Sequence, residues 1–501
     1  MYLIGLDVGT TGCKAIVFDP DGQIKGAGYE EYDVVGTEPA MAEQDAEQVW
    51  RLACRALRAA VVRSGVKTIG ALSVSVQGDA VIPVDKNLRA LHRAVLGMDY
   101  RSQPQARECA ERCGAFALFR RTGMRPHPMN ALTKVMWLRE RVPDVFARTW
   151  KMVTYADFIL GKLGAEPVID FTMASRTMGF DLAARRWSRT ILDKLDLDAA
   201  LFSRPVPSGT VVGKIRQSLA AELGLPSRVL LASGAHDQSC AALGAGVIAE
   251  HRGVVSTGTA EVLATALARP VLTRRMFASY YPCYAHAKPG QFFTFTLNHT
   301  AGILLKWFRD QFCQPEIAEA RKRRTDPYQV LDGRMPAGPA PVMVLPHFNG
   351  SGTPWCDLES KGAFLGLNLA TTRHDLAKAI LEALTFELRI NLDTLEQSGI
   401  RVDTLAAAGG GAKSPVWLQM KADILNRPIR TLRCRESACL GAAQLAGAAA
   451  GVYRSLDEAV AQTVSPDREF TPQAAAVRQY QERFGLYQEL YPALRRLGRR
   501  L

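Results

Sequence analysis

The strongest constraint on the fold is a strand–turn–strand unit that opens the chain and recurs near its middle. Residues 2–7 and 13–18 have the pattern of two strands, joined by the turn Val8-Gly9-Thr10-Thr11-Gly12. Residues 254–263 repeat this pattern around Thr257-Gly258-Thr259. The chain has 501 residues, whereas a single hydrophobic core stops growing at about 250–300 residues. We therefore expect two similar halves, the second beginning near Gly253.

Polar or glycine-rich turns follow the other predicted strands. These turns are Gln77-Gly78-Asp79 between strands 69–76 and 80–84, Gly234-Ala235-His236-Asp237 after strand 229–233, and Gly409-Gly410-Gly411-Ala412 after strand 404–408. Helical periodicity predicts helices at 43–64, from 238, from about 414 and from about 471. The alternation of strands and helices favours an α/β fold.

The composition and charge exclude several classes of protein. The formal net charge is +13, but the basic residues are scattered, apart from 321–324 and the tail, and no nucleic-acid-binding pattern accompanies them. No apolar run approaches the ~20 residues of a membrane span, and the chain opens on a strand rather than a secretory signal. Ten cysteines without a CxxC pair are typical of reduced thiols. We expect a cytoplasmic protein that binds a small molecule rather than nucleic acid or a membrane.

The predicted C-terminal helix carries an apolar stripe at helical spacing. The stripe consists of Tyr480, Phe484, Tyr487, Tyr491 and Leu494. We expect it to dock on the second half of the same chain, with a contact in a homodimer as the alternative.

The two Gly/Thr turns are candidate phosphate sites. Free backbone N–H groups and threonine hydroxyls at a hairpin tip can donate hydrogen bonds to phosphate oxygens, although one such turn can also be a simple tight connection. Two of them facing each other across a cleft would hold one polyphosphate. Asp7 ends the strand before the first turn, where its carboxylate would suit a Mg²⁺ ion held mostly through water or would cap the turn.

Asp237 is the candidate general base. It lies where a predicted buried strand meets a helix, so it could cap the helix or could orient and deprotonate a substrate hydroxyl. The turn at 409–412 lacks large side chains and could lie flat against a purine or serve as a tight connection. A Walker A loop is excluded, because its nearest match at 209–215 is one residue short and lacks the hydroxyl residue.

Taken in order, these motifs resemble the FGGY carbohydrate kinases of the sugar kinase, actin and Hsp70 superfamily. The resemblance spans nearly the whole chain and rests on LIGLDVGTTGCKAIVFD at 3–19, DFTMASRTMGFDL at 170–182, SGAHDQSCAALGAG at 233–246, GAFLGL at 362–367 and GGGAKSPVW at 409–417. A further signature at 129–140 has Lys134 and Trp137 in place but Ala131 where a small hydroxyl or proline is usual. The resemblance implies an α/β fold of two actin-like (ribonuclease H-like) domains, 1–247 and 248–501, with a cleft between them.

The resemblance also implies the roles of individual residues. The N-terminal domain would bind the sugar and supply Asp237 as the base, and Asp7 and Asp237 would place Mg²⁺. The C-terminal domain, which ends in the helical tail, would bind ATP. The implied ATP contacts are Gly9, Thr10, Thr11, Thr257, Gly258, Thr259, Gly302, Gly410, Gly411 and Ala412. The implied substrate contacts, with turn caps and surface ion pairs as the alternative roles, are Gln77, Gly78, Asp79, Asp99, Arg101 and Gln238.

Within the family, chain length and motifs are most similar to xylulose kinases, which makes D-xylulose the first candidate substrate. Two departures bear on that choice. Gly78-Asp79 stands where those enzymes commonly carry Met-His, and 349–354 departs from the usual Gly-Glu-Arg-Thr-Pro. The alternatives are L-fuculose, L-ribulose, gluconate or a linear signalling diol, with glycerol less favoured because the Arg-Glu pair of glycerol kinases is absent. A nucleotide-binding scaffold without catalysis is the alternative of another class.

Overall fold

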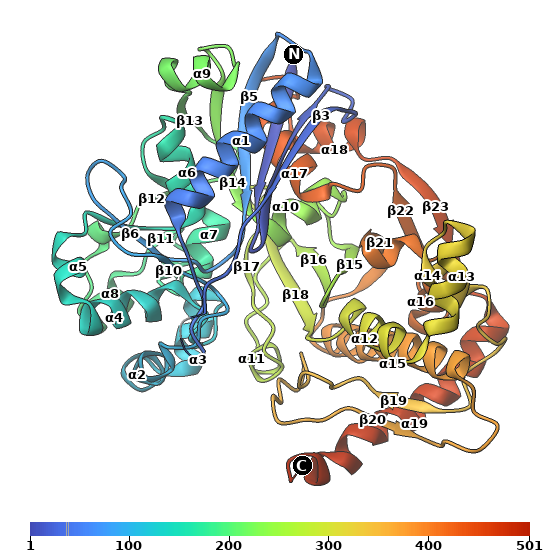
Figure 1. The fold of residues 1–501 in the computed structure, drawn as a ribbon. Helices are drawn as coiled ribbons and strands as arrows, with labels where there is room; N and C mark the ends of the chain where they lie inside the picture. The colour runs from blue at the N-terminus through green and yellow to red at the C-terminus, as the bar shows by residue number, and fades with distance from the viewer. Residues whose placement is uncertain (37, 39, 501) are drawn as a thin grey trace.

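The computed structural model describes residues 1–36, 38 and 40–500, and two sheets form the framework of the molecule (Figure 1). The first sheet has the strand order β13-β14-β5-β1-β2-β3. Its strands are β1 (Tyr2–Val8), β2 (Gly12–Phe18), β3 (Ile24–Glu31), β5 (Ile69–Val76), β13 (Val211–Lys214) and β14 (Leu230–His236). The second sheet has the order β17-β18-β16-β15-β21-β22-β23. Its strands are β15 (His251–Thr257), β16 (Glu261–Leu267), β17 (Tyr284–Ala285), β18 (Phe292–Asn298), β21 (Val402–Gly409), β22 (Ile429–Leu432) and β23 (Pro466–Phe470).

The two sheets repeat one topology. In each, an antiparallel hairpin (β1–β2 or β15–β16) is extended by a third antiparallel strand, β3 or β18. Two parallel strands join on the other side of the first strand, β5 and β14 in one sheet and β21 and β22 in the other. The two Gly/Thr turns therefore occupy equivalent positions. The predicted α/β class and the predicted repeat of the hairpin are confirmed.

Helices cover both sheets, and short strands complete the connections. The helices before residue 250 are α1 (Ala46–Ser64), α2 (Gln103–Cys113), α3 (Ala115–Thr122), α4 (Ala131–Arg141), α5 (Pro143–Arg148), α6 (Tyr155–Leu163), α7 (Phe171–Arg176), α8 (Arg189–Lys194), α9 (Gln217–Leu223) and α10 (Asp237–Gly244). Those after it are α11 (Arg274–Ala278), α12 (Gly302–Phe312), α13 (Gln314–Arg323), α14 (Pro327–Asp332), α15 (Arg373–Gln397), α16 (Pro415–Leu425), α17 (Ser437–Ala449), α18 (Leu456–Thr463) and α19 (Ala474–Gly498). The short strands are β4 (Glu43–Gln44), β6 (Ile82–Val84), β7 (Ala94–Val95), β8 (Lys151–Val153), β9 (Val168–Asp170), β10 (Phe180–Asp181), β11 (Arg186–Trp187), β12 (Arg204–Val206), β19 (Met343–Leu345) and β20 (Ala363–Leu365). In the described part of the chain, no helix has both the length and the apolar character needed to cross a membrane.

Helices α10 and α17 lie side by side at the centre of the molecule (Figure 1). Although α17 comes late in the chain, it packs on β1, β5 and β14 of the first sheet. The contact is backbone against backbone, because a Cβ on Gly5 would lie 1.8 Å from the carbonyl oxygen of Cys439 and one on Gly244 2.0 Å from that of Ser437. Only glycine fits at such a crossing, which accounts for the small residues that follow Asp237. The second half of the chain thus completes the core of the first sheet.

Several element boundaries differ from the sequence-based prediction, among them those of α1, β14 and β6. Helix α1 begins at Ala46 rather than at 43, because the Asp45 side chain caps it by accepting the N–H groups of Glu47 and Gln48. Glu43–Gln44 instead pairs with β7 as a short strand. Strand β14 continues to His236, three residues past its predicted end, and β6 begins at Ile82 instead of 80.

The C-terminal helix α19 docks on the chain's own second half, as predicted, against α15 and α16. Four residues of the stripe are buried, namely Tyr480, Phe484, Tyr487 and Tyr491. The last one, Leu494, is only half-buried. The tyrosine hydroxyls bond to carboxylates of the second half, for example Tyr487 to Glu387 at 2.6 Å.

Candidate active site

Uncharged hydrogen-bond donors bond to the backbone carbonyl groups of the first Gly/Thr turn. The turn closes when the Gly9 N–H donates to the Gly12 carbonyl at 3.0 Å. The Tyr32 hydroxyl lies 2.8 Å from the Gly9 carbonyl oxygen and 2.9 Å from that of Gly12. The Gln44 side-chain amide donates to the Thr10 carbonyl. The carbonyl groups of the turn are thus occupied by the protein.

Gln77, a predicted substrate contact, also supports this turn. Its side-chain amide donates to the Gly9 carbonyl at 3.2 Å and to Gln44 Oε1 at 2.9 Å, and its own Oε1 accepts from the Thr10 hydroxyl at 3.2 Å. Among the described residues, no acceptor meets the backbone N–H of Thr10 or Thr11. These two N–H groups are therefore free to donate to a ligand.

A buried ion pair anchors the second Gly/Thr turn. Lys421 of α16 donates to the Thr257 hydroxyl at 2.8 Å and pairs with Glu261 at the start of β16. The Thr257 hydroxyl donates in turn to Glu261 Oε1 at 2.6 Å. The Lys421 side chain is 2% exposed and that of Glu261 is 0% exposed, so the pair is shielded from solvent. The hydroxyl of Thr257 is therefore engaged by the protein.

Backbone N–H groups at the start of helix α12 form hydrogen bonds with the same turn. The N–H of Gly302 donates to the Gly258 carbonyl and that of Ala301 to the Thr259 carbonyl, both at 2.9 Å. A cavity of about 390 Å³ opens at this point. Six predicted ATP contacts line it, namely Thr257, Gly258, Thr259, Gly302, Gly410 and Gly411. Ala412, the seventh predicted on this half, lines a neighbouring cavity of about 600 Å³ instead.

Asp237 is the first residue of α10 and directly follows β14. Its Oδ1 accepts the N–H of Gln238 at 2.6 Å and lies 3.2 Å from Nε2 of His236. Burial raises the pKa of Asp237 to about 7, and the negative charge of Asp7 contributes to the shift. Burial also raises the pKa of Asp7 to about 6, although the Ser75 hydroxyl donates to it at 2.6 Å. Two carboxylates that titrate near neutral pH therefore influence each other at the end of the first sheet.

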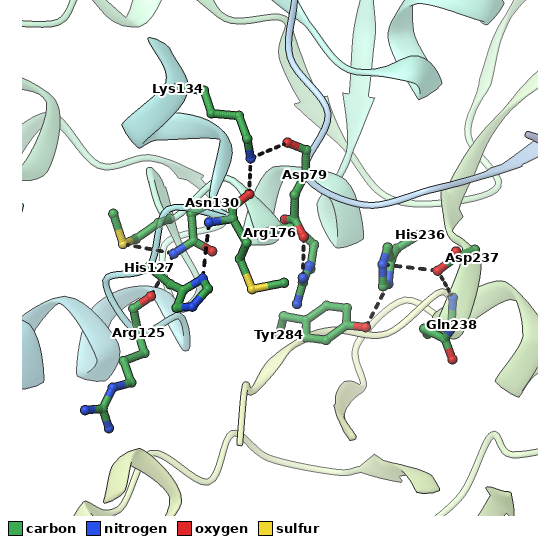
Figure 2. Close-up of polar contacts among 12 residues, drawn as sticks. Asp79, Arg125, His127, Asn130, Lys134, Arg176, His236, Asp237, Gln238 and Tyr284 are labelled. Atoms are coloured by element: carbon green, nitrogen blue, oxygen red, sulfur yellow. Dashed lines mark hydrogen bonds and ion pairs between the residues drawn. The ribbon is translucent and has the colours of Figure 1, made fainter. Parts of the chain in front are cut away.

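A buried ion pair between Asp79 and Arg176 lies beside Asp237 (Figure 2). Asp79 has a left-handed φ of 68°, and the Lys134 ammonium donates to its carbonyl oxygen at 3.1 Å. Asp79 Oδ1, Arg176 Nε and Asn130 Oδ1 are buried and have no hydrogen-bond partner among the described residues. An unsatisfied buried polar atom costs about 1–3 kcal/mol, so these atoms indicate a place where a polar ligand completes the hydrogen bonds.

His236 and Tyr284 connect this cluster to the second sheet. Nδ1 of His236 lies 2.9 Å from the hydroxyl of Tyr284 on β17. The Arg176 guanidinium lies 5.5 Å from the centre of the Tyr284 ring. Gly78 faces the imidazole, because a Cβ there would lie 2.6 Å from Nε2 of His236. Of the six predicted substrate contacts, Gly78, Asp79 and Gln238 thus lie around Asp237.

Asp99 and Arg101 are engaged with each other. Arg101 pairs with Asp99 at 2.8 Å and with Glu43 at 2.7 Å, and its guanidinium lies 4.8 Å from the Trp137 ring centre. The Asp99 carboxylate also accepts the Ala42 N–H at 2.6 Å. This ion pair is buried rather than on the surface. Its predicted part in substrate binding stays a prediction.

Three functional candidates were missed by the sequence analysis. Arg176 and His236 lie within quoted motifs, at 170–182 and 233–246, but nothing local marks their side chains. Tyr284 lies in no motif, and its position opposite His236 arises only when the two sheets come together. Within the described ranges, no group of three or more His, Cys, Asp or Glu side chains forms a metal-ligand set. The predicted role of the Asp7 and Asp237 carboxylates at a cation stays a prediction.

Models of the FGGY family of carbohydrate kinases match both halves, the N-terminal domain at residues 2–244 and the C-terminal domain at residues 253–450. The chain belongs to this family. FGGY kinases are phosphotransferases that use ATP and a sugar hydroxyl as acceptor. The predicted kinase class is therefore confirmed, and the non-catalytic scaffold is set aside.

The FGGY relatives differ in the acceptors that their names give. The chain is 28% identical to the xylulose kinase of Bacillus subtilis, over 98% of this chain and 96% of the relative. It is 27% identical to the gluconokinase of the same organism, over 96% and 93%. The solved structure of ligand-bound xylulose kinase from Lactobacillus acidophilus superposes with a TM-score of 0.89 at 26% identity, covering 98% of each chain. The predicted two-domain, actin-like fold is thereby confirmed.

Proposed function

We propose that this FGGY kinase transfers the γ-phosphoryl group of ATP, with Mg²⁺, to a terminal hydroxyl of a small ketose. D-xylulose, giving D-xylulose 5-phosphate, is the first candidate. The observation that carries the proposal is the Asp237 carboxylate, which is half-buried, lies next to the contact between His236 and Tyr284 of the second half, and has its pKa raised by desolvation to about 7. A base with a pKa near the working pH can take the proton of an attacking hydroxyl efficiently. Residues 1–247 would supply this base and the sugar site, and 248–501 the nucleotide site.

The nucleotide would lie in the 390 Å³ cavity, with its phosphates between the two Gly/Thr turns. The free N–H groups of Thr10 and Thr11 would donate to phosphate oxygens from the first half. The turn at Thr257–Thr259, held by Lys421, would do so from the second half. Phosphoryl transfer depends mainly on alignment and on neutralisation of oxygen charge, which a rigid backbone cradle provides.

Asp7 and Asp237 fit the Mg²⁺ ion that this reaction implies. The negative charge of each disfavours ionisation of the other, as the raised pKa of Asp237 reflects, so a cation between them would relieve an existing repulsion. Mg²⁺ is commonly held by one or two carboxylates together with phosphates and water. When bound, the ion would neutralise negative charge on the transferring phosphoryl group.

The polar cluster beside Asp237 supports a neutral acceptor. Asp79 Oδ1 and Arg176 Nε are buried without partners among the described residues, and sugar hydroxyls can both donate and accept there. The positive charge of Arg176 is already matched by Asp79, so its guanidinium is not free to pair with a carboxylate on the acceptor. This pairing favours a ketose over a sugar acid such as gluconate.

A panel of acceptors tests the substrate. Turnover would be measured by coupled ADP detection with D-xylulose, L-ribulose, L-fuculose, gluconate and glycerol. We expect the highest kcat/KM for D-xylulose and a value for gluconate lower by ~10-fold or more, because a buried polar site discriminates against a mismatched group. Faster turnover of gluconate than of any ketose would contradict the assignment.

Replacement of the base tests the mechanism. We expect Asp237→Asn to lower kcat by at least ~10²-fold, the usual contribution of a general base, while ATP still binds. The control is Asp193→Asn, which changes an exposed carboxylate on α8 and should leave turnover unchanged. Full sugar-dependent turnover in Asp237→Asn would remove this residue from its proposed role.

A further inference from the structure

Residues 123–130 connect α3 to α4 in the first half and touch the second half of the chain. The Arg125 guanidinium donates to the carbonyl oxygen of Phe277 in α11 at 2.6 Å. It also lies 4.3 Å from the ring centre of Phe277 and 3.9 Å from that of Tyr280. Because the face of an aromatic ring attracts a cation, Arg125 combines a charged hydrogen bond with two ring contacts. This one side chain attaches the connection to α11.

The backbone beside Arg125 is fixed to the same part of the second half. The Cys283 N–H donates to the Gly123 carbonyl at 2.9 Å. Gly123 has a left-handed φ of 71°, and a Cβ there would lie 1.5 Å from the Cys283 carbonyl oxygen. Only glycine permits so close an approach. The position of Arg125 is thereby set by its backbone as well as by its side chain.

The other end of the connection holds the turn that carries Asp79 (Figure 2). The Lys134 ammonium, in a residue that is 0% exposed, donates to the Asp79 carbonyl at 3.1 Å and also to the Met129 carbonyl. The Asn130 side-chain amide donates to the Arg125 carbonyl at 2.7 Å. A continuous set of hydrogen bonds and peptide units therefore runs from Arg125 to the backbone of Asp79.

The same connection borders the other predicted substrate segment, at residues 99–101. The Ser102 hydroxyl donates to the Pro128 carbonyl at 3.1 Å. The His127 ring stands edge-on to Tyr100, with the ring centres 5.4 Å apart. Both predicted substrate segments are thus in contact with one connection, and Arg125 attaches that connection to the second half.

We propose that Arg125 is a positioning residue for the acceptor sugar, which fixes the turn at Asp79 relative to the second half. The inference rests on the proposed sugar site around Asp79. Oδ1 of Asp79 has no partner among the described residues, whereas Oδ2 pairs with Arg176, so Oδ1 is the atom left for a sugar hydroxyl. Loss of Arg125 would free the connection and displace this atom. The nucleotide cavity would keep its shape, because none of its lining residues belongs to 123–130.

The KM values of the two substrates test the proposal, with the sugar of highest kcat/KM in the panel above. Arg125→Met removes both the charge and the hydrogen-bond donor. We expect it to raise the KM for the sugar by ~5–20-fold and to leave the KM for ATP within ~2-fold of wild type. Arg125→Lys keeps a cation over the two rings and should recover part of the loss. A role confined to folding would not separate the two KM values.

Arg274→Met is the matched control. The Arg274 guanidinium of α11 lies 4.5 Å from the ring centre of Phe116 in α3, so it makes the same kind of contact between the same two halves, but outside residues 123–130. We expect both KM values of this variant to stay within ~2-fold of wild type. A milder variant, Tyr280→Leu, removes one of the two rings beside Arg125 at a position that is 37% exposed. It should raise the KM for the sugar by ~2–4-fold.

An unchanged KM for the sugar in Arg125→Met would overturn the inference. Equal rises for the sugar and for ATP, or the same rise in Arg274→Met, would also overturn it, since either shows a general effect of the contact between the halves. If Arg125→Met fails to fold, Tyr280→Leu decides alone. Failure of the proposed function is a different result: full turnover in Asp237→Asn refutes the proposed base, whereas a normal KM for the sugar in Arg125→Met refutes only the inference.

Discussion

The two Gly/Thr turns occupy equivalent places in equivalent sheets, yet their electrostatic surroundings are opposite. At the second turn, the Glu261 carboxylate is neutralised by Lys421 in a shielded ion pair. At the first, Asp7 accepts a hydroxyl hydrogen bond from Ser75 and is influenced by the charge of Lys14, but within the described residues it forms no ion pair. The charge of Glu261 is balanced within the protein, although its Oε2 has no hydrogen-bond partner among the described residues. The first retains negative charge that a cation or a proton can satisfy, which is the condition expected of the side where chemistry takes place.

The largest expected effect comes from breaking the charge balance of the second turn. Lys421→Met leaves Glu261 buried without a counter-charge, and we expect a loss of about 3–5 kcal/mol in the free energy of unfolding. Denaturant titration measures this loss. The double variant Lys421→Met/Glu261→Gln should recover most of it, because no buried charge remains. Equal losses in the single and double variants would show that the pair contributes packing rather than neutralisation.

An intermediate effect of the opposite sign is expected at Asp237, in the first half of the chain. The folded-state pKa of Asp237, about 7, lies above its ordinary value of 3.8, so folding favours the protonated form. The associated stability is present at pH 4 and is lost as the pH rises through 7. We expect Asp237→Asn to raise the free energy of unfolding by about 1–2 kcal/mol at pH 8 and to leave it unchanged at pH 4.

Thermal unfolding of wild type and variant across this pH range checks the expectation. A variant that is equally stable at both pH values, or less stable at pH 8, would show that the carboxylate is not destabilised in the fold. The gain in stability together with the loss of turnover would identify a group kept in place for activity.

The smallest effect is expected from the loss of an uncharged hydrogen-bond donor to the first turn. Tyr32→Phe removes the hydroxyl between the Gly9 and Gly12 carbonyls, and we expect a loss of about 1 kcal/mol in stability with a ~2–5-fold rise in the KM for ATP. Tyr453→Phe is the control, since it removes a buried hydroxyl that bonds to the Pro20 carbonyl at 2.8 Å, away from the turn. A similar rise in KM in both variants would show a general effect on the first half.

Features set by neighbouring residues could be predicted from the sequence. The β1–β2 hairpin joins residues ten or so apart, so its turn residues and its alternation are visible in a short window. The same holds for Asp237, which stands where a buried strand meets a small-residue helix. The start of α1 was misplaced by three residues because the pattern does not show which polar residue caps the helix; the structure shows that it is Asp45.

Contacts between distant segments could not be predicted. Asp79 and Arg176 are 97 residues apart, and Glu261 and Lys421 are 160 residues apart. No local pattern distinguishes these side chains from the other charged residues of the chain. Their pairing depends on how loops from different elements converge, which hydrophobic periodicity does not specify. The predicted substrate contacts also come from several such loops, which is why the sequence leaves several acceptors open.

The packing of α17 on the first sheet has a consequence for how the polypeptide is made. Strand β14 ends at His236, but the helix that covers its sheet begins only at Ser437. During translation, at ~5–20 residues per second, one apolar surface of the newly made first half would stay uncovered for roughly 10–40 s. A fragment that stops after residue 247 would keep that surface bare permanently, so we expect it to aggregate or to be held by chaperones rather than to fold by itself.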